Sequence, residues 1–311
     1  MKRHSISFAI ILLFIIMLIF PKAVFRGASE GLLLWFEIVL PTLLPFIIVS
    51  NLLIHTNSIS YISRLLGPII ARLFGVSKTG SFAILVGFLC GYPMGSKVTS
   101  DLVKSNRISL PEGTYLLSFC NNTSPIFIMS YVVWQNLETE SLIIPSLIIL
   151  YAAPILSSIL FRLYYRRQLK SALHTSKQRN SSISLKFSIV DTCIMNGFET
   201  IVKVGGYIIL FSVLLTLLKL LPVELSIWRQ VLLPMMEITN GIPLLVEEIT
   251  DSGRQFIYIL SLTSFGGLCA IAQTNCMIQG TALKIKPYII QKLITTCVTS
   301  MLAYAYLLLF F

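Results

Sequence analysis

Residues 80–107 read GSFAILVGFLCGYPMGSKVTSDLVKSNR, and this stretch decides the fold. Its apolar first part, residues 81–90, makes about 15 Å of helix, half the thickness of a bilayer's hydrocarbon core. The segment GYPMGSK at 91–97 then breaks the helix, because Pro93 lacks a backbone N–H and stands between two glycines. A polar part, residues 98–106, follows. Half a helix, a break and a returning half-helix predict a re-entrant hairpin inside a membrane.

The composition agrees with a membrane protein of several spans. Of 311 residues, 55% are hydrophobic and only 12% are charged, against about 25% charged residues in soluble proteins. The mean hydropathy is +0.84. These values exclude a soluble domain and a primary role in nucleic-acid binding, and they make the lipid bilayer the first partner. The six cysteines and three histidines show no metal-ligand spacing, so we expect no metal, no cofactor and no enzyme.

Apolar segments divide the first half of the chain. Lys2 and Arg3 precede residues 5–20, which we interpret as a retained transmembrane helix, domain 1–28, with its N-terminus in the cytoplasm. A span at 31–55, a short helix at 59–74, the hairpin and a span at 110–134 follow, and residues 141–164 form a further span. Residues 166–186 are strongly basic, which predicts a cytoplasmic loop. The excess of basic residues that gives the net charge of +11 then reflects the orientation of the chain in the membrane.

The second half resembles the first. Its apolar segments are 196–221, 228–249, 255–280 and 287–311, and the third is interrupted at Gly266-Gly267 and at 273–275. Glycines and prolines align between the halves: Gly31 with Gly197, Pro68 with Pro234, Gly91 with Gly267 and Pro111 with Pro287. Domains 29–165, a first repeat plus an extra span, and 187–311, a second repeat, would then have opposite orientations. The predicted fold is an all-α polytopic membrane protein with an inverted repeat, two re-entrant hairpins and discontinuous helices, as in secondary transporters.

Polar residues at membrane depth are the candidates for a site. Lys97 follows the hairpin tip and Asp101 lies four residues on, on the same helix face; they form either a substrate-carboxylate contact held by Asp101 or a self-neutralising structural pair. The glycine series at 87, 91 and 95 indicates either close helix packing or a tip that approaches a ligand. Polar residues also interrupt the span at 110–134, where a new half-helix begins at Pro125 and directs free N–H groups at the break. The predicted substrate-binding residues are Gly91, Tyr92, Pro93, Gly95, Ser96, Lys97, Asp101, Asn121, Asn122, Thr123, Ser124, Gln273, Thr274 and Asn275.

Two motifs together resemble a known family. GFLCGYPMGSK at 87–97 and FCNNTSPIFI at 119–128 resemble the sporulation integral membrane protein YlbJ family, of the nucleoside-recognition (Gate) domain group. The resemblance covers nearly the whole chain. It implies a role in endospore formation, in moving dipicolinate across the outer forespore membrane, and a core similar to that of concentrative nucleoside transporters. The second predicted hairpin departs from the pattern, since Gly266-Gly267 lacks the Gly-Tyr-Pro signature.

Three functions remain open at this point. The first is a sporulation transporter for a small organic anion, dipicolinate, which a lysine and half-helix N-termini would bind. The second is a transporter of nucleosides or other neutral solutes with the same fold. The third is a non-transporting membrane scaffold for a sporulation complex, in which other sporulation membrane proteins or a second copy of the chain would be partners.

Overall fold

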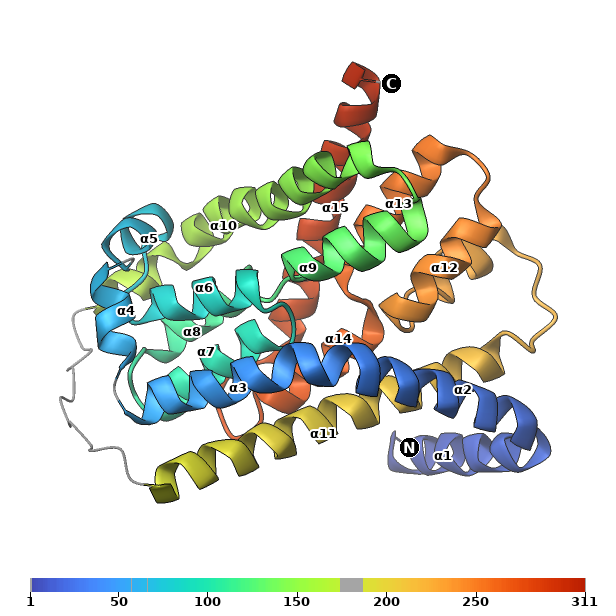
Figure 1. The fold of residues 1–311 in the computed structure, drawn as a ribbon, viewed down its shortest axis with the longest axis horizontal. Coiled ribbons are helices and arrows are strands. Elements are labelled where there is room, and N and C mark those ends of the chain that lie inside the picture. The colour runs from blue at the N-terminus through green and yellow to red at the C-terminus, as the bar shows by residue number, and fades with distance from the viewer. Residues whose placement is uncertain (1, 57, 66, 174–186, 311) are drawn as a thin grey trace.

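The computed structural model describes residues 2–56, 58–65, 67–173 and 187–310. Within those ranges all regular structure is helical and no strand is present (Figure 1). Five helices are long and apolar enough to cross a membrane, judged by length and composition. Many large apolar side chains on α1, α10 and α15 are exposed, as lipid contact requires. The structure therefore confirms an all-α protein with the helices of a polytopic membrane protein.

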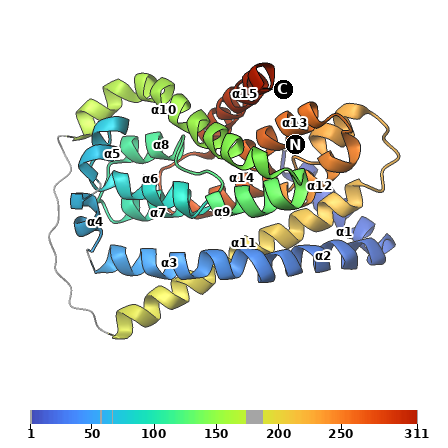
Figure 2. The same ribbon diagram turned by 45° about the horizontal axis from the view of Figure 1, so that its top comes forward.

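Two long helices form one side of the molecule. After α1 (Lys2–Ile19), helices α2 (Pro21–Leu34) and α3 (Leu40–His55) join through a wider π-helical turn, η1 (Trp35–Val39), into one helix of 35 residues. This span begins at Pro21 and not near residue 31, because a proline is favoured in the first helical turn; the predicted boundary at residue 28 falls inside it. Helix α11 (Phe187–Leu218) packs along this helix, as Figures 1 and 2 show, and Trp35 Nε1 donates to the carbonyl of Ile201 at 2.9 Å.

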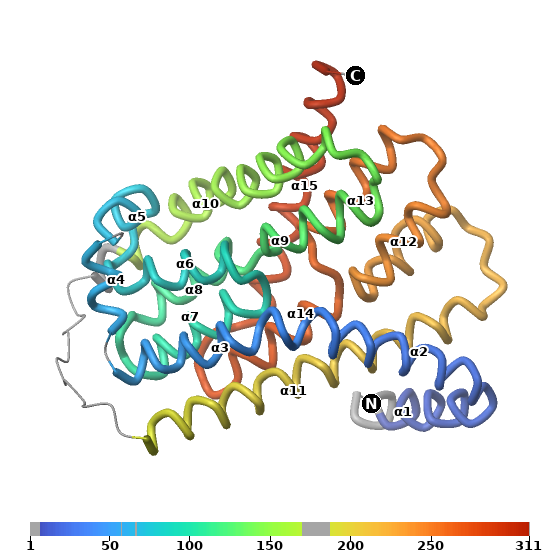
Figure 3. The backbone as a smooth tube through the Cα atoms, in the orientation of Figure 1, coloured from blue at the N-terminus to red at the C-terminus, as the bar shows by residue number. Residues whose placement is uncertain are grey.

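The predicted hairpin of the first half is present. Two short helices, α4 (Ile59–Leu65) and α5 (Gly67–Phe74), lead into α6 (Gly80–Leu89). The chain turns over at residues 90–93 and returns as α7 (Met94–Lys104), which packs against α6 (Figure 3). We call α6, this tip and α7 the first hairpin. Its buried side chains form the largest apolar core together with α3, α8 and α11.

The predicted interruption of the next span is also present. Helix α8 (Leu110–Leu117) ends, residues 118–124 are not helical, and the helix resumes as α9 (Pro125–Phe127) and η2 (Ile128–Leu137). We call residues 118–124 the first break. A short turn, η3 (Glu140–Leu142), leads into α10 (Ile143–Leu173). The start of the predicted basic loop therefore belongs to α10, and residues 174–186 of that loop lie outside the described residues.

The second half differs from the prediction in two places. The segment 228–249 is not one span, because η4 (Trp228–Leu232) is followed by a turn at residues 233–237 and α12 (Ile238–Glu248) then packs back against η4. We call residues 233–237 the second turn, counting the tip of the first hairpin as the first. Gly266-Gly267 is not a hairpin tip: α13 (Ser252–Phe265) and α14 (Gly267–Met277) together form one candidate span of 26 residues. Gly266 interrupts it with φ of 85°, and we call this position the second break.

The last predicted interruption is absent from the structure. Residues 273–275 are helical within α14, because Gln273 and Thr274 find polar partners while the helix continues. The alignment of Gly91 with Gly267 is therefore wrong, since it pairs a hairpin tip with a helix break. The chain ends with α15 (Ile285–Phe310), which packs on α10, α13 and α14.

Candidate functional site

The first hairpin packs its tip against the first break. Residues Gly87 and Gly95 lie so close to the carbonyl of Cys120 that a Cβ atom at either position would overlap it. At the tip, Gly91 has φ of 84°, and a Cβ there would lie 2.9 Å from the backbone nitrogen of Ser124. The glycine series thus serves close packing and places the tip beside the break at the same time.

The second turn packs against the second break in a similar way. The backbone N–H groups of Leu268 and Cys269, in the first turn of α14, donate to the carbonyls of Met235 at 2.7 Å and Met236 at 3.0 Å. The turn therefore supplies acceptors that the start of a helix otherwise lacks. Glu237 ends this turn and caps α12, because its carboxylate accepts the backbone N–H of Thr239 at 3.1 Å and that of Asn240 at 2.9 Å.

Direct hydrogen bonds join the first break to the helices on either side of the second break and to α15. Asn121 Nδ2 donates to Thr274 Oγ1 at 2.9 Å and to the hydroxyl of Tyr288 at 3.0 Å. Thr123 Oγ1 donates to the carbonyl of Thr263 at 3.1 Å. The first break is therefore fixed to α13, α14 and α15, although the bonded residues lie more than a hundred positions apart in the chain.

A buried lysine lies where the first break meets the helices around the second break, a place that we call the crossing. Lys292 of α15 is 2% exposed, and its ammonium nitrogen lies 3.3 Å from Asn122 Oδ1 and 3.1 Å from the carbonyl oxygen of Ser264. Sequence reasoning missed this residue. The signal was available, because a lysine inside an apolar helix of 26 residues is costly and marks function by default.

A cavity of about 250 Å³ lies where the hairpin tip, the second turn and both breaks converge. Apolar side chains of α2–α3, α9–η2 and α11 form most of its wall. Of the predicted site residues, it is lined by Gly91, Tyr92, Thr123, Ser124 and Gln273. The hydroxyl of Tyr92 is buried without a well-formed hydrogen bond among the described residues, and Thr123 is its polar neighbour. These five residues, from three separate segments, make the cavity the candidate binding site.

The other predicted residues lie outside this cavity wall. Asn121, Asn122 and Thr274 are buried in the crossing just described, whereas Asn275 is exposed on α14. The remaining five residues are Pro93, the last residue of the hairpin tip, and Gly95, Ser96, Lys97 and Asp101 of α7. Sequence reasoning also missed polar residues that line the cavity, namely Thr42, Ser130, Tyr131, Gln135, Glu237 and Thr239. Nothing in the sequence placed Glu237 opposite the hairpin tip.

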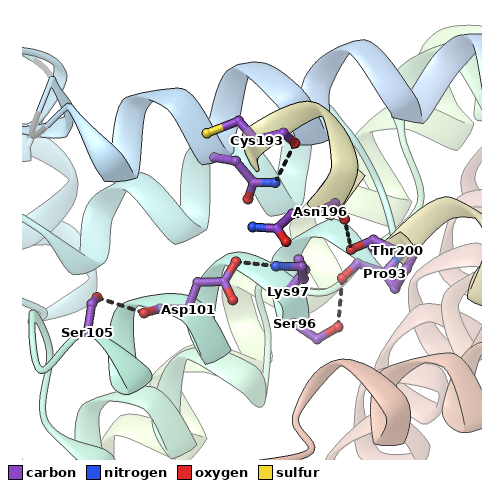
Figure 4. Close-up of polar contacts among 9 residues, drawn as sticks. Pro93, Ser96, Lys97, Asp101, Ser105, Cys193, Asn196 and Thr200 are labelled. Atoms are coloured by element: carbon purple, nitrogen blue, oxygen red, sulfur yellow. Dashed lines mark hydrogen bonds and ion pairs between the residues drawn. The ribbon is translucent and has the colours of Figure 1, made fainter. Parts of the chain in front are cut away.

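Lys97 and Asp101 form the ion pair that their spacing predicts. Lys97 Nζ lies 2.5 Å from Asp101 Oδ2, and the two side chains are 17% and 19% exposed. Figure 4 shows the pair on α7, with Asn196 of α11 beside Lys97. The pair faces α11 and not the cavity, so a contact between Lys97 and a substrate stays a prediction.

Among the residues that the structure describes, no group of three or more His, Cys, Asp or Glu side chains could hold a metal ion. Fold and site together define a polytopic helical membrane protein in which a hairpin, a turn and two interrupted helices enclose a central cavity.

The chain belongs to the family of the sporulation integral membrane protein YlbJ. It is 30% identical to that protein from Bacillus subtilis (strain 168) over an aligned length of 308 residues. The alignment covers 88% of this chain and 75% of the relative. No family model matches the chain, and no solved structure matches it.

Proposed function

We propose that this protein is a membrane transporter of a small organic solute, which binds in the central cavity. The observation that carries the proposal is the convergence of a hairpin tip, a turn and two helix breaks on one cavity. Interrupted helices expose backbone groups away from water, and such groups are tolerated at membrane depth where they line a cavity or are buried in protein. Transporters use these elements to hold a substrate between two gates.

An inverted repeat would give the protein two alternating openings. In the pairing we propose, α2–α3 corresponds to α11, and the first hairpin corresponds to η4, the second turn and α12. The first break then corresponds to the second break, and α10 to α15. Each half supplies one turn and one break, and each turn packs against the break of its own half. This pairing replaces the alignment of Gly91 with Gly267 and supports the likeness to concentrative nucleoside transporters and the Gate domain group.

We take the substrate to be dipicolinate and the membrane to be the outer forespore membrane. Support comes from the relative's name, which assigns that protein to sporulation, and from the two motifs that carry the resemblance. A dianion needs positive charge along its path. We propose that Lys292, behind the first break, supplies this charge in its protonated form, whereas Lys97 lies beside the hairpin tip, paired with Asp101 and facing α11.

A neutral solute such as a nucleoside is the second candidate. One observation favours it: no lysine, arginine or histidine is among the described residues that line the cavity, whereas the carboxyl group of Glu237 is. Hydroxyl and amide groups at the wall suit hydrogen bonds to an uncharged ligand.

The test compares spores of a strain that lacks this protein with spores that carry it again. The proposal predicts spores poor in dipicolinate when the protein is absent, although the mother cell makes dipicolinate, and restoration by the wild-type protein. Restoration by variants with bulky residues in the cavity wall, such as Ala270→Phe, would instead support a scaffold. A normal dipicolinate content without the protein would remove dipicolinate as the substrate.

A further inference from the structure

Lys292 is a buried basic residue without a carboxylate partner among the described residues. Lys292 belongs to α15, and its side chain is buried in the protein. No carboxylate oxygen among the described residues lies within 4.0 Å of its amine nitrogen, because the ion pairs present there involve other basic residues. An ammonium group away from water is costly unless an anion or several acceptors surround it. A lysine at this depth therefore calls for a function.

The two acceptors of Lys292 belong to different segments. Asn122 Oδ1 comes from the first break, and the carbonyl of Ser264 comes from the last turn of α13, next to the second break. One amine thus connects the two breaks directly behind the cavity wall, since Thr123 follows Asn122 and lines the cavity. A change at this nitrogen acts on both breaks.

The number of hydrogen-bond donors differs between the two forms of the amine. A neutral amine has two N–H donors, and an ammonium group has three. Two acceptors are present in the closed crossing, so the neutral amine is satisfied there. The ammonium would keep one N–H and a full charge without a partner. Protonation therefore requires a further acceptor, either water or an anion, and bulk water barely reaches a side chain that is 2% exposed.

We propose that Lys292 is a proton-binding site: it is neutral while the crossing is closed and takes up a proton from water when the crossing opens and an anionic substrate enters. The proton bonds to the lone pair of the amine, and it leaves again to water when the anion is released. The inference rests on the proposed transport function and makes that transport a joint movement of a proton and an anion.

Other titratable groups near the crossing are few. The thiol of Cys120, in the first break, is the group that acts on Lys292 electrostatically. Tyr288 of α15 accepts a hydrogen bond from Asn121, and Tyr165 of α10 accepts one from Gln291. The faces of α13 and α14 present Ser264 and Thr274, which do not titrate. The carboxyl of Glu237, across the cavity, is the competing proton site.

The test follows access to the cavity as pH changes. Cys269 lines the cavity, so a protein with Cys269 as its one cysteine reports access through its rate of maleimide labelling. Dividing the rate for Lys292 by the rate for Lys292→Met in the same background removes the pH dependence of thiol chemistry itself. Between about pH 8 and pH 5 the ratio should rise as pH falls, by up to about tenfold per pH unit for one proton. A constant ratio would overturn the inference.

Two further variants complete the test. If Lys292→Met fails to reach the membrane, Lys292→Arg replaces it, because arginine does not titrate in this range either. Glu237→Gln should keep the pH-dependent ratio. If the labelling rate of Glu237→Gln, divided by that of Glu237→Gln with Lys292→Met, no longer changed with pH, the proton would be assigned to Glu237 and the inference would be contradicted.

Transport measurements separate this inference from the proposed function. In proteoliposomes, an inward proton gradient should drive dipicolinate above equilibrium through the wild-type protein, whereas Lys292→Met should at most equilibrate it. Uptake that ignores the gradient would refute the proton site and leave the transporter standing. No uptake of dipicolinate, with labelling of Cys269 still dependent on pH through Lys292, would refute the substrate and leave the proton site standing.

Discussion

The polar atoms of Asn121 and Asn122 are engaged by the protein itself. Asn121 donates to Thr274 and Tyr288, and its Oδ1 accepts the backbone N–H of Ser96 at 3.3 Å. Asn122 donates to the carbonyl of Phe119 at 2.6 Å and accepts from Lys292. Both asparagines therefore fix the crossing of the two breaks, and the cavity wall is left to their neighbours Thr123 and Ser124.

Replacing Asn122 with leucine should leave membrane insertion intact and lower transport. The substitution removes one of the two acceptors of Lys292, so the crossing loses the connection between its two breaks. The measurement is substrate uptake normalised to protein in the membrane fraction. Asn136→Leu is a matched control, because it removes an asparagine hydrogen bond from the far end of η2. Equal uptake by both variants and the wild type would mean that the contact has no role in transport.

Replacing Glu237 with glutamine should destabilise the protein. Glu237 is buried, and its carboxylate accepts from Thr239 and Asn240 at the start of α12. An amide puts an N–H₂ group where an acceptor is needed, so we expect a loss of about 1–2 kcal/mol, as for a helix cap. Thermal unfolding in detergent checks this. Glu248→Gln, in an exposed pair with Arg229, should change little, and an equal loss in both variants would contradict the capping role.

At the scale of elements, the sequence predicts the first half better than the second. Two local sequence patterns correctly predict breaks in the first half. One is a ten-residue apolar helix followed by Gly-Tyr-Pro, and the other is a run of four polar residues before Pro125. The second half depends on distant contacts. The carbonyls of Met235 and Met236 allow α14 to restart after Gly266, and Asn121 lets the polar segment 273–275 remain helical. Only part of the cavity wall could be predicted, for the same reason. Gly91, Tyr92, Thr123 and Ser124 belong to local motifs, whereas Glu237 and Thr239 lie at the end of a turn and just after it, where the sequence shows no motif.

A methyl group at Gly95 should reduce the amount of folded protein. The Cβ of alanine would overlap the carbonyl of Cys120, which is backbone and cannot turn aside. Overpacking of this kind costs about 1–3 kcal/mol. Gly206→Ala is the matched control, since nothing lies within 4 Å of a Cβ placed there. Size-exclusion profiles and unfolding midpoints in detergent give the measure, and two variants of equal stability would show that the hairpin does not press on the first break.

Charge divides the whole molecule into two ends. Basic residues are concentrated on α4 and α5, at the left of Figure 1, in the turns at 75–79 and 105–109, at the end of α7 and of α10 and at the start of α15: Arg64, Arg72, Lys78, Lys104, Arg107, Arg162, Arg166, Arg167, Lys284 and Lys286. The opposite end, at η2, α12 and the starts of α13 and α2, carries Glu30, Glu138, Glu140, Glu224, Glu247, Glu248 and Asp251 beside Lys22, Arg26, Lys219, Arg229 and Arg254. By the positive-inside rule we expect the first end to face the cytoplasm.

Single cysteines should reveal this orientation. In a background without native cysteines, Ser176→Cys, in the basic loop outside the described residues, should react only from the cytoplasmic side. Ser252→Cys, at the start of α13, should react only from the other side. Labelling of both positions from one side would contradict the assigned topology and, with it, the inverted repeat.

The most direct test of the central claim is dipicolinate uptake by purified protein in proteoliposomes, with and without a blocked cavity. Ala270 lines the cavity and is 3% exposed, so Ala270→Phe should place a ring in the proposed binding site while removing none of the hydrogen-bonding groups of the crossing. The account predicts uptake by the wild-type protein and none above protein-free vesicles for an equal amount of folded Ala270→Phe. No uptake by the wild type, or undiminished uptake by Ala270→Phe, would contradict a transporter that works through this cavity.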